Sequence, residues 1–297
     1  MRKTLPALLL IAAVSGCAAT AVPKKTHKAA TTATVRPCGQ AGKAAAQRYD
    51  HVVWIVMENK SYSDVMGSSS SSPFVRSLGA ACGVATAFHA ETHPSLPNYL
   101  AMTSGSTHGV HDDSPPSSHR IRGPSIFSQL GSGWRALQES MPRPCDRSAS
   151  LLYAPKHNPA AYYTNLAGTC GKQNVKLGNP PDLSARFTFI TPNLCHDSHS
   201  CGTGTGDRYL AGLIPKIVAS SEYRAGRAAV FITWDEDDGS KGNHIPTIVI
   251  SPHTPAGMRS AGRFTHYSLL RTTEEMLGLK KVGAASTAPS MRAAFGL

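Results

Sequence analysis

The sequence predicts an α/β sandwich, and three observations support this fold class. Apolar runs at 51–57, 186–192, 228–234 and 245–251 have the length and composition of buried strands. Segments whose apolar residues recur at helical spacing separate several of these runs, and alternating strands and helices are typical of α/β proteins. The first three runs also end abruptly at polar side chains, as strands do where a sheet carries a binding site.

The side chains that follow the first three runs can all bind a ligand. Glu58 and Asn59 follow the first run, Asn193 follows the second, and four consecutive acidic residues follow the third. Ligands of open α/β sheets bind outside the carboxyl ends of the strands, so we expect one shared polar pocket there. Carboxylates crowded in it would repel one another and become partly protonated unless a cation lay among them. We therefore expect a metal site, and its candidate carboxylates are Glu58, Asp197, Asp235 and Glu236.

Two later segments have the pattern of amphipathic helices. Asp207 is expected to cap the first of them, and Pro215 is expected to kink it. The second runs from Tyr267 to Leu277, where Gly278 should end it. No internal repeat and no second folded domain are expected. The apolar face of the first helix comprises Leu210, Leu213, Ile214, Ile217 and Val218.

The first 16 residues have the pattern of an export signal. Arg2 and Lys3 precede the apolar run Leu5–Val14, which is too short to span a membrane and leads to small residues. The sequence VSGC at 14–17 resembles a bacterial lipobox, which predicts that Cys17 becomes the lipidated N-terminus. The protein would then be exported and held on the outer face of the cell membrane. An ordinary signal peptide with secretion of the protein is the alternative.

Residues 17–48 are expected to form a flexible basic tether, and residues 49–297 the catalytic domain. The tether is rich in Ala, Thr and Lys and contains no acidic residue. The net charge of the whole chain is +12, but eight basic residues lie before position 49, so the domain carries only +4. A nucleic-acid-binding protein would concentrate its charge on the folded domain, whereas a basic tail suits an anionic membrane surface. We therefore expect no nucleic-acid partner.

Six of the seven cysteines remain if Cys17 is lipidated, and an even number in an exported protein indicates disulfides. Pairing neighbours in sequence gives Cys145–Cys170 and Cys195–Cys201, which leaves Cys38–Cys82. This connectivity is one of about fifteen that six cysteines allow. Zinc thiolates are the weaker alternative, because no CxxC motif occurs.

The segment ETHPSLPNYLAMTSG at 91–105 contains the candidate nucleophile. Pro97 suits the first turn of a helix and Gly105 its end, which places Ser95 at or just before the helix N-terminus. Free backbone N–H groups and the helix dipole favour a phosphate there and lower the pKa of a hydroxyl bound to a metal. A plain N-cap serine is the alternative interpretation.

Four motifs together resemble the bacterial phosphoesterase family that includes acid phosphatases and phospholipases C. They are HVVWIVMENKSYSDVMG from residue 51, ETHPSLPNYLAMTSG, WDEDDG, and HYSLLRTTEEMLGL at 266–279. The motifs span residues 51–279, so the resemblance covers the whole expected domain. It implies an alkaline-phosphatase-like three-layer sandwich, in which a central, mostly parallel sheet has helices on both faces.

The resemblance also implies roles for individual residues. Glu58 and Asn59 match the family's first metal-binding pair, and Asp235 and Glu236 match the second. Ser95 matches the reactive position, for which Thr92 is the competitor. The segment from Asn193 resembles a P-N-x-x-x-D-x-H motif, which adds Asp197 to the metal ligands. The remaining catalytic candidates are Asn98 as a donor to a phosphoryl oxygen, and His93, His199 and His266 as proton donors or phosphate ligands.

The functional hypothesis is a metal-dependent acid phosphatase that acts on phosphomonoesters, phosphoinositides among them, through a phosphoseryl intermediate. Asp235–Glu236 stands where two-metal relatives carry Asp-His, so the pair favours one hard divalent cation, whose identity is left open. The expected partner is a phosphorylated small molecule or a phospholipid head group. A phospholipase C-type phosphodiesterase and a non-catalytic surface-binding lipoprotein are the alternatives.

Overall fold

A computed structural model of the protein describes residues 1, 37–39 and 48–297, and the fold below is that of the unit formed by residues 35–297. The expected signal peptide, lipidated Cys17 and most of the tether lie outside the described residues, so their interpretation stays a prediction. Among the residues described, no helix has the length and apolar character needed to cross a bilayer.

One nine-stranded sheet forms the centre of the unit, in the order β4-β3-β5-β1-β6-β7-β2-β8, with β9 beside β2. Strand β7 runs antiparallel to both of its neighbours, and every other pairing is parallel. The mostly parallel sheet expected from the sequence is thereby confirmed. The strands are β1 His51–Met57, β2 Gly83–His89, β3 Trp134–Gln138, β4 Asn174–Lys176, β5 Phe187–Thr191, β6 Ala228–Trp234, β7 His244–Ile250, β8 Met258–Ser260 and β9 Phe264–Thr265.

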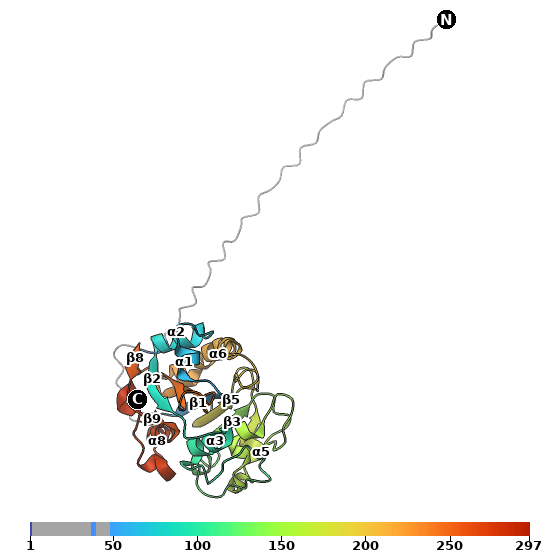
Figure 1. Ribbon diagram of the computed structural model, residues 1–297, viewed down its shortest axis with the longest axis vertical. Helices are drawn as coiled ribbons and strands as arrows, with labels where there is room; N and C mark the ends of the chain where they lie inside the picture. Colours follow the sequence, from blue (N-terminus) through green and yellow to red (C-terminus); the bar gives the residue numbers. More distant parts are fainter. Residues whose placement is uncertain (2–36, 40–47) are drawn as a thin grey trace. The chain divides into compact units, whose positions relative to one another are not determined.

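Helices cover both faces of this sheet, which explains why the central strands are apolar throughout. Figure 1 shows α1, α2 and α6 on one side of β1 and β5, and α3 and α8 on the other. The α-helices are α1 Tyr62–Met66, α2 Pro73–Ala81, α3 Ser95–Ser104, α4 Ile126–Gln129, α5 Cys170–Gln173, α6 Thr203–Val218, α7 Ser221–Arg224, α8 His266–Leu277 and α9 Arg292–Phe295. Short 3₁₀ turns lie at η1 Pro155–His157, η2 Pro159–Ala161, η3 Thr164–Leu166 and η4 Gly283–Ser286.

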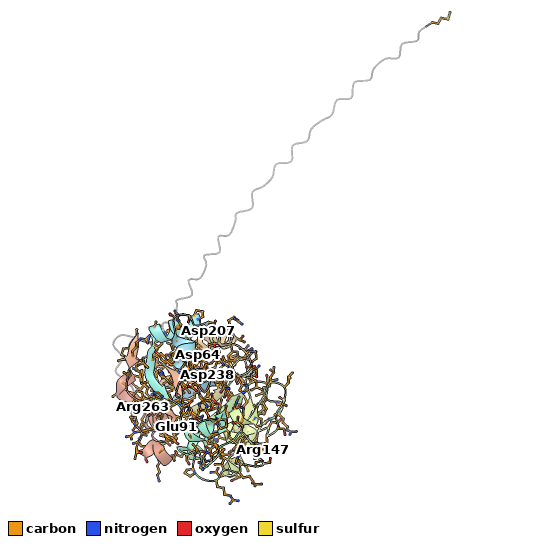
Figure 2. All side chains as sticks on the ribbon, in the orientation of Figure 1. Asp64, Glu91, Arg147, Asp207, Asp238 and Arg263 are labelled. Atoms are coloured by element: carbon orange, nitrogen blue, oxygen red, sulfur yellow. A yellow bond between two sulfur atoms is a disulfide. The ribbon has the colours of Figure 1, made fainter. Side chains whose placement is uncertain are left out.

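The helix expected to begin at Asp207 begins earlier, and Asp207 has another function. Helix α6 starts at Thr203 and continues through Pro215 to Val218. The Asp207 carboxylate accepts hydrogen bonds from the backbone N–H groups of Phe74 (3.1 Å) and Val75 (2.8 Å), in the first turn of α2. Asp207, labelled in Figure 2, therefore caps the neighbouring helix instead of its own.

The disulfides have the connectivity expected from neighbouring cysteines. Cys38 pairs with Cys82, Cys145 with Cys170, and Cys195 with Cys201. The first joins residues 37–39 to the end of α2, and the other two close loops between elements. These bridges fix the loops that the sheet itself does not hold.

Four parallel strands bring their carboxyl ends to one edge of the sheet. These are β5, β1, β6 and β2, and antiparallel β7 begins at the same edge. The residues that follow the strands therefore meet here: Glu58 after β1, residues 192–199 after β5, Asp235 after β6, and residues 90–95 after β2. The polar residues expected to share one pocket therefore lie together at this edge.

Candidate active site

Glu58 lies at the centre of this edge and is fully buried. The Tyr99 hydroxyl of α3 donates a 2.5 Å hydrogen bond to Glu58 Oε1, and the Glu58 N–H donates to the Asp197 carbonyl. Burial, together with the charges of Asp235 and Asp197, raises the pKa of Glu58 well above its usual value. Asn59 has a positive φ of 54°, which points its N–H at Asp235 Oδ1, 3.1 Å away.

Ser95 is the first residue of α3 and is 1% exposed. Its Oγ lies 3.3 Å from Glu58 Oε2 and 3.4 Å from Glu236 Oε1. The adjacent N–H of Leu96 donates to Asp113 Oδ1 at 2.9 Å, and Lys156 Nζ pairs with the other oxygen of Asp113 at 2.8 Å. The candidate nucleophile thus lies at a helix N-terminus, between two of the expected metal ligands.

Asn98 holds the loop that carries Ser95. Its Oδ1 accepts from the N–H groups of Glu91 and Thr92, and its Nδ2 donates to Thr92 O, Pro94 O and Glu236 Oε2. The Thr92 hydroxyl donates to the carbonyl of His93, 3.1 Å away. In this arrangement the Asn98 amide positions residues 91–95, and Thr92 Oγ faces the backbone of its own loop.

His93 stands at the mouth of the site. Its Nδ1 lies 2.9 Å from Glu236 Oε2 and its Nε2 lies 3.3 Å from Asp237 Oδ1. The His93 side chain is 43% exposed, so it can meet a substrate from solvent. An open cavity of about 390 Å³ begins here, and it is lined by Asn59, Lys60, His93 and residues 236–239.

His157, in η1, is a site residue that the sequence analysis missed. Its Nε2 lies 3.2 Å from Glu58 Oε1, its Nδ1 lies 3.4 Å from Asp197 Oδ2, and its ring stacks on Tyr99 with centroids 5.4 Å apart. Burial lowers the pKa of His157 to about 3, which keeps the imidazole neutral and able to bind a metal. The surrounding PKHNP has no strand pattern and no motif spacing, so nothing in the sequence marks this histidine.

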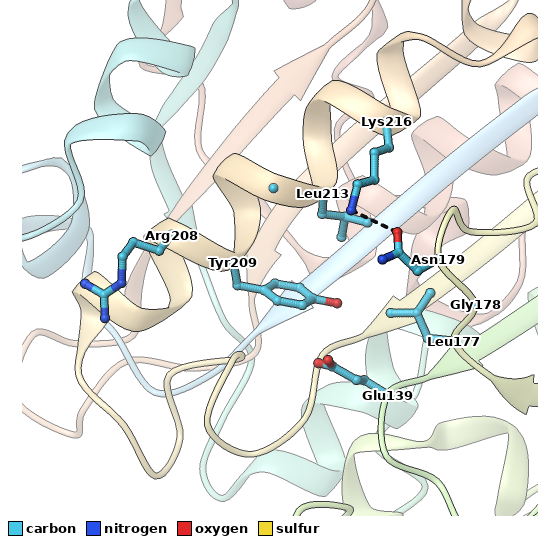
Figure 3. A pocket seen from close by; sticks show the side chains of 9 residues that line it. Glu139, Leu177, Gly178, Asn179, Arg208, Tyr209, Leu213 and Lys216 are labelled. Carbon is cyan, nitrogen blue, oxygen red and sulfur yellow. Dashed lines mark hydrogen bonds between the residues drawn. The ribbon is translucent and has the colours of Figure 1, made fainter.

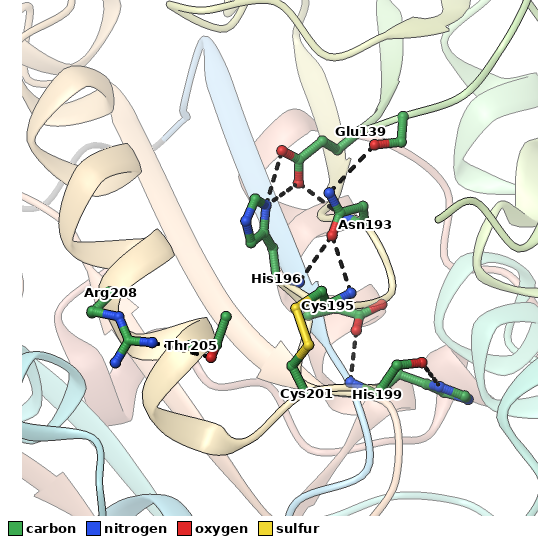
Figure 4. The surroundings of a disulfide bond; sticks show 11 residues. Glu139, Asn193, Cys195, His196, His199, Cys201, Thr205 and Arg208 are labelled. Atoms are coloured by element: carbon green, nitrogen blue, oxygen red, sulfur yellow. Dashed lines mark hydrogen bonds and ion pairs between the residues drawn. A yellow bond between two sulfur atoms is a disulfide. The ribbon is translucent and has the colours of Figure 1, made fainter. Parts of the chain in front are cut away.

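The loop after β5 sends its side chains in two directions (Figure 4). Asn193 Oδ1 accepts from the N–H groups of Cys195 and His196, so Asn193 stabilises the turn. His196 points to Glu139, 2.9 Å away, and Glu139 lines a separate cavity of about 270 Å³ with Tyr209 (Figure 3). Asp197 and His199 belong to the metal-ligand side of the loop, and Asp197 Oδ1 accepts the His199 N–H at 2.7 Å.

The cluster satisfies the chemistry of a cation site. Glu58, His157 and His199 each offer one ligand atom, and these atoms lie within 4.8 Å of one another. Burial raises the pKa of Asp197 to about 7, of Asp235 to about 6 and of Glu236 to about 9, so a cation bound among these carboxyls would stabilise their ionised forms. Among the described residues, the buried polar atoms left without a hydrogen bond include Asp197 Oδ2, Asp235 Oδ2, His157 Nε2 and His266 Nδ1.

His266, the first residue of α8, is buried and contacts the backbone of Asp235. Its Nε2 lies 2.7 Å from the Asp235 carbonyl, and a carbonyl can only accept, so Nε2 carries the proton and Nδ1 keeps a lone pair. Burial lowers the pKa of His266 to about 4, which makes it a neutral base. The two imidazoles near Glu58 and the lone pair on His266 extend the donor set beyond the oxygen ligands considered from the sequence.

The fold and site together define a class of protein: an α/β protein with a serine at a helix N-terminus and a buried cluster of candidate metal ligands. Comparison with known proteins gives the family. The phosphoesterase family matches residues 69–280, and the chain belongs to this family. It is therefore an enzyme of the phosphoric ester hydrolase class.

The names of similar proteins support this family assignment, because they are phosphatases. The chain is 32% identical over 268 residues to the phosphatidylinositol-3-phosphatase of Mycobacterium tuberculosis, covering 86% of this chain and 87% of the relative. It is 24% identical to an acid phosphatase of Aspergillus fumigatus, of which it spans 60%. Among solved structures, an alkaline phosphatase superfamily protein from Vibrio parahaemolyticus superposes with a TM-score of 0.57 at 13% identity, covering 85% of this chain and 74% of that one, which supports the expected fold.

Proposed function

We propose that this enzyme is an exported, metal-dependent acid phosphatase that hydrolyses phosphomonoesters through a phosphoseryl intermediate. The observation that carries the proposal is the position of Ser95 Oγ, within 3.4 Å of both Glu58 and Glu236 at the N-terminus of α3. A serine used only as a cap would not need two buried carboxylates beside its hydroxyl.

A divalent cation fits the residues around Ser95. Glu58, Asp197, Asp235, His157 and His199 would hold it, with Asn59 and Glu236 at the side facing the open cavity. When bound, such a cation supplies positive charge that lowers the pKa of a nearby hydroxyl and stabilises phosphoryl oxygens. This mixture of carboxylate and imidazole ligands can bind several different divalent metal ions.

The residues of the chain account for the remaining steps. Ser95 Oγ attacks phosphorus, forming the Oγ–P bond while the bond to the leaving alcohol breaks. The Ser95 proton passes to the Glu236 carboxylate beside it, and His93, exposed at the mouth, protonates the departing alkoxide. The proton on Glu236 then returns to His93, whose Nδ1 lies 2.9 Å from Glu236 Oε2. Water then cleaves the phosphoseryl bond and releases phosphate, which restores the Ser95 hydroxyl. Asn98 acts in both steps by holding the Ser95 loop against Glu236.

Phosphomonoesters are the proposed substrates, with phosphoinositide head groups among them. The relative that is 32% identical over most of both chains is a phosphatidylinositol-3-phosphatase, which favours a phosphorylated lipid head group over a soluble diester. A phospholipase C-type diesterase would need room for a second alcohol beside Ser95. A non-catalytic surface lipoprotein would have no reason to keep Ser95 between two carboxylates.

The nucleophile can be tested by trapping the intermediate. We expect rapid quenching of the enzyme with ³²P-labelled phosphomonoester to place the label on Ser95, and the Ser95→Ala variant to lose both label and turnover. Thr92→Val is the matched control and should keep both, because the Thr92 hydroxyl faces the His93 carbonyl. Label on Thr92, or turnover in Ser95→Ala, would overturn the assignment.

A substrate panel separates the three candidate functions. We expect turnover of p-nitrophenyl phosphate and phosphatidylinositol 3-phosphate, and little turnover of bis(p-nitrophenyl) phosphate or phosphatidylcholine. The reverse order would favour a phospholipase C-type diesterase. Lack of turnover with every substrate and every divalent metal would favour the non-catalytic lipoprotein.

Export and membrane anchoring are proposed from the basic residues Arg2 and Lys3, the apolar run Leu5–Val14 and the sequence VSGC at its end. If Cys17 carries lipid, the Cys17→Ser variant should leave the membrane fraction, because acyl chains supply the apolar area of the anchor. Unchanged partition between membrane and soluble fractions would point to a simple signal peptide.

A further inference from the structure

A second cavity, which we name the arginine pocket, lies outside the metal-ligand cluster. It has a volume of about 390 Å³, and its walls include Arg120, Arg147, Ser117, Ser148, Tyr162 and Thr164. It shares no lining residue with the cavity at Glu236, and Arg147 lies well apart from Asp238 in Figure 2. Its volume falls within the range of about 300–1,000 Å³ that small-ligand sites occupy.

The two arginines of this pocket are not paired within the described part of the chain. Several other arginines bind a carboxylate, as Arg135 binds Asp182 and Arg271 binds Glu275. No hydrogen bond or ion pair within the described residues reaches Arg120 or Arg147, and no acidic residue lines the pocket. The cavity in Figure 3 differs, because its wall contains the acidic residue Glu139 as well as Arg208 and Lys216.

The nearby acids already have other partners. Asp112 binds His119 at 2.6 Å and Asp113 binds Lys156 at 2.8 Å, although both belong to the loop that leads to Arg120. Asp146, next to Arg147, accepts from the Ser148 N–H and pairs with Arg143. The positive charge of the pocket is therefore not balanced by its own loops.

The backbone around the pocket is held in place before any ligand arrives. Ile121, next to Arg120, exchanges backbone hydrogen bonds with Tyr162 (3.0 Å) and Thr164 (2.9 Å). The Tyr162 hydroxyl donates to the Ser114 carbonyl, and the Cys145–Cys170 disulfide anchors the loop of Arg147. A preformed site loses less conformational entropy on binding, which favours affinity.

We propose that the arginine pocket binds a phosphate-type oxyanion, as a second anion site separate from Ser95. Guanidinium groups bind phosphate and sulfate oxygens in a planar, two-pronged geometry, and the hydroxyls of Ser117 and Ser148 can add further donors. The volume accommodates a small phosphorylated group, either a free anion or the head group of a lipid. The site does not depend on the proposed chemistry at Ser95.

Binding of sulfate by isothermal titration calorimetry tests the pocket, because sulfate has the shape of phosphate and is not a phosphoester. We expect the full chain to bind sulfate at least about tenfold more tightly than the Arg120→Ala/Arg147→Ala variant, as loss of charge-assisted hydrogen bonds implies. The control Arg122→Ala/Arg263→Ala removes the same charge outside the pocket and should bind like the unchanged chain. Equal weakening in both variants, or in neither, would overturn the proposal.

Vesicles distinguish the two sources of the anion. Phosphatidylcholine vesicles with and without phosphatidic acid should be offered to the same three proteins. Loss of binding to the phosphatidic acid vesicles only in the Arg120→Ala/Arg147→Ala variant supports a lipid head group. Loss of sulfate binding with unchanged vesicle binding supports a free anion. Circular dichroism of each variant shows that it is folded, so that unfolding does not imitate a lost site.

Discussion

Burial decides the chemistry of the individual residues in this site. Glu58, Asp197 and Asp235 are fully buried, so each pays a desolvation cost that neighbouring backbone donors only partly offset. The sequence motifs identified these carboxylates because they follow apolar strands. They did not identify Tyr99 and His157, since a mid-helix tyrosine has the pattern of a core residue and His157 lies in an irregular turn. Residues recruited from irregular backbone leave no periodic signal.

Replacing Tyr99 with Phe tests how Glu58 is oriented. The variant loses the 2.5 Å hydrogen bond to Glu58 Oε1, and we expect kcat/KM to fall about tenfold or more, as loss of a ligand's supporting hydrogen bond usually does. Tyr163→Phe is the matched control, because the Tyr163 hydroxyl is equally buried but contacts Thr103. Both should lose about 1 kcal/mol of stability. Equal activity losses in the two variants would show that Tyr99 acts only through folding.

Replacing Asp235 with Asn tests the charge of the metal-ligand cluster. Asparagine keeps an acceptor for the Asn59 N–H but removes a negative charge at Oδ2, an atom without a hydrogen bond. We expect bound metal to be lost and activity to fall by at least ~100-fold, since metal assistance contributes several kcal/mol. Metal content and initial rates are the measurements. Asp182→Asn, an exposed change outside this cluster, should alter activity by less than about threefold.

At the scale of the elements, long apolar strands could be predicted and others could not. The runs at 51–57 and 228–234 match β1 and β6, and the other two differ from β5 and β7 by one residue at the ends. Strands β2 and β3 were not predicted, because GVATAFH and WRALQ contain small or polar residues and no continuous apolar run. The direction of β7 was also beyond the sequence, since strand direction depends on pairing with β6 and β2.

We expect the Cys195–Cys201 disulfide to affect turnover and the Cys38–Cys82 disulfide to affect mainly stability. Cys195 and Cys201 enclose Asp197 and His199, so we expect the Cys195→Ser/Cys201→Ser variant to lose turnover at temperatures where it is still folded. Its bridge spans only 6 residues, and loop-closure entropy assigns it about 2 kcal/mol. Rates and circular dichroism measured across one temperature series separate the two effects.

The Cys38→Ser/Cys82→Ser variant is the control for that experiment. This bridge spans 44 residues, which implies about 4 kcal/mol of stability, and Cys82 precedes β2 at the opposite end of that strand from residues 90–95. We expect a larger drop in Tm with turnover unchanged at low temperature. If the Cys195→Ser/Cys201→Ser variant keeps full turnover until it unfolds, the bridge has no influence on the position of Asp197.

For the whole molecule, the buried titratable groups determine how stability depends on pH. Carboxyls with a raised pKa keep their protons in the folded state after the unfolded chain has lost them, so they lower stability as pH rises. Asp197, with a pKa of about 7, and Glu236, with a pKa of about 9, lower stability in this way until the pH passes those values. Buried histidines have the opposite effect below their usual pKa, because His157 and His266 stay neutral while the unfolded chain gains protons. Above pH 7 only the carboxyl effect remains.

We therefore predict that chelator-treated protein loses thermal stability between pH 7 and pH 9, with a Tm lower by about 5 °C or more. Ca²⁺ or Mn²⁺ should remove most of this loss, because a cation replaces the protons of the cluster and binds more tightly as the carboxyls ionise. Burial also raises the pKa of Glu274 to about 8, and this residue lies two turns after His266 in α8. Glu274 should therefore contribute a part of the stability loss that metal does not change. The Glu274→Gln variant should lack that part. A Tm that is flat over this range in chelator, and unmoved by either metal, would show that the cluster neither retains protons nor binds a cation.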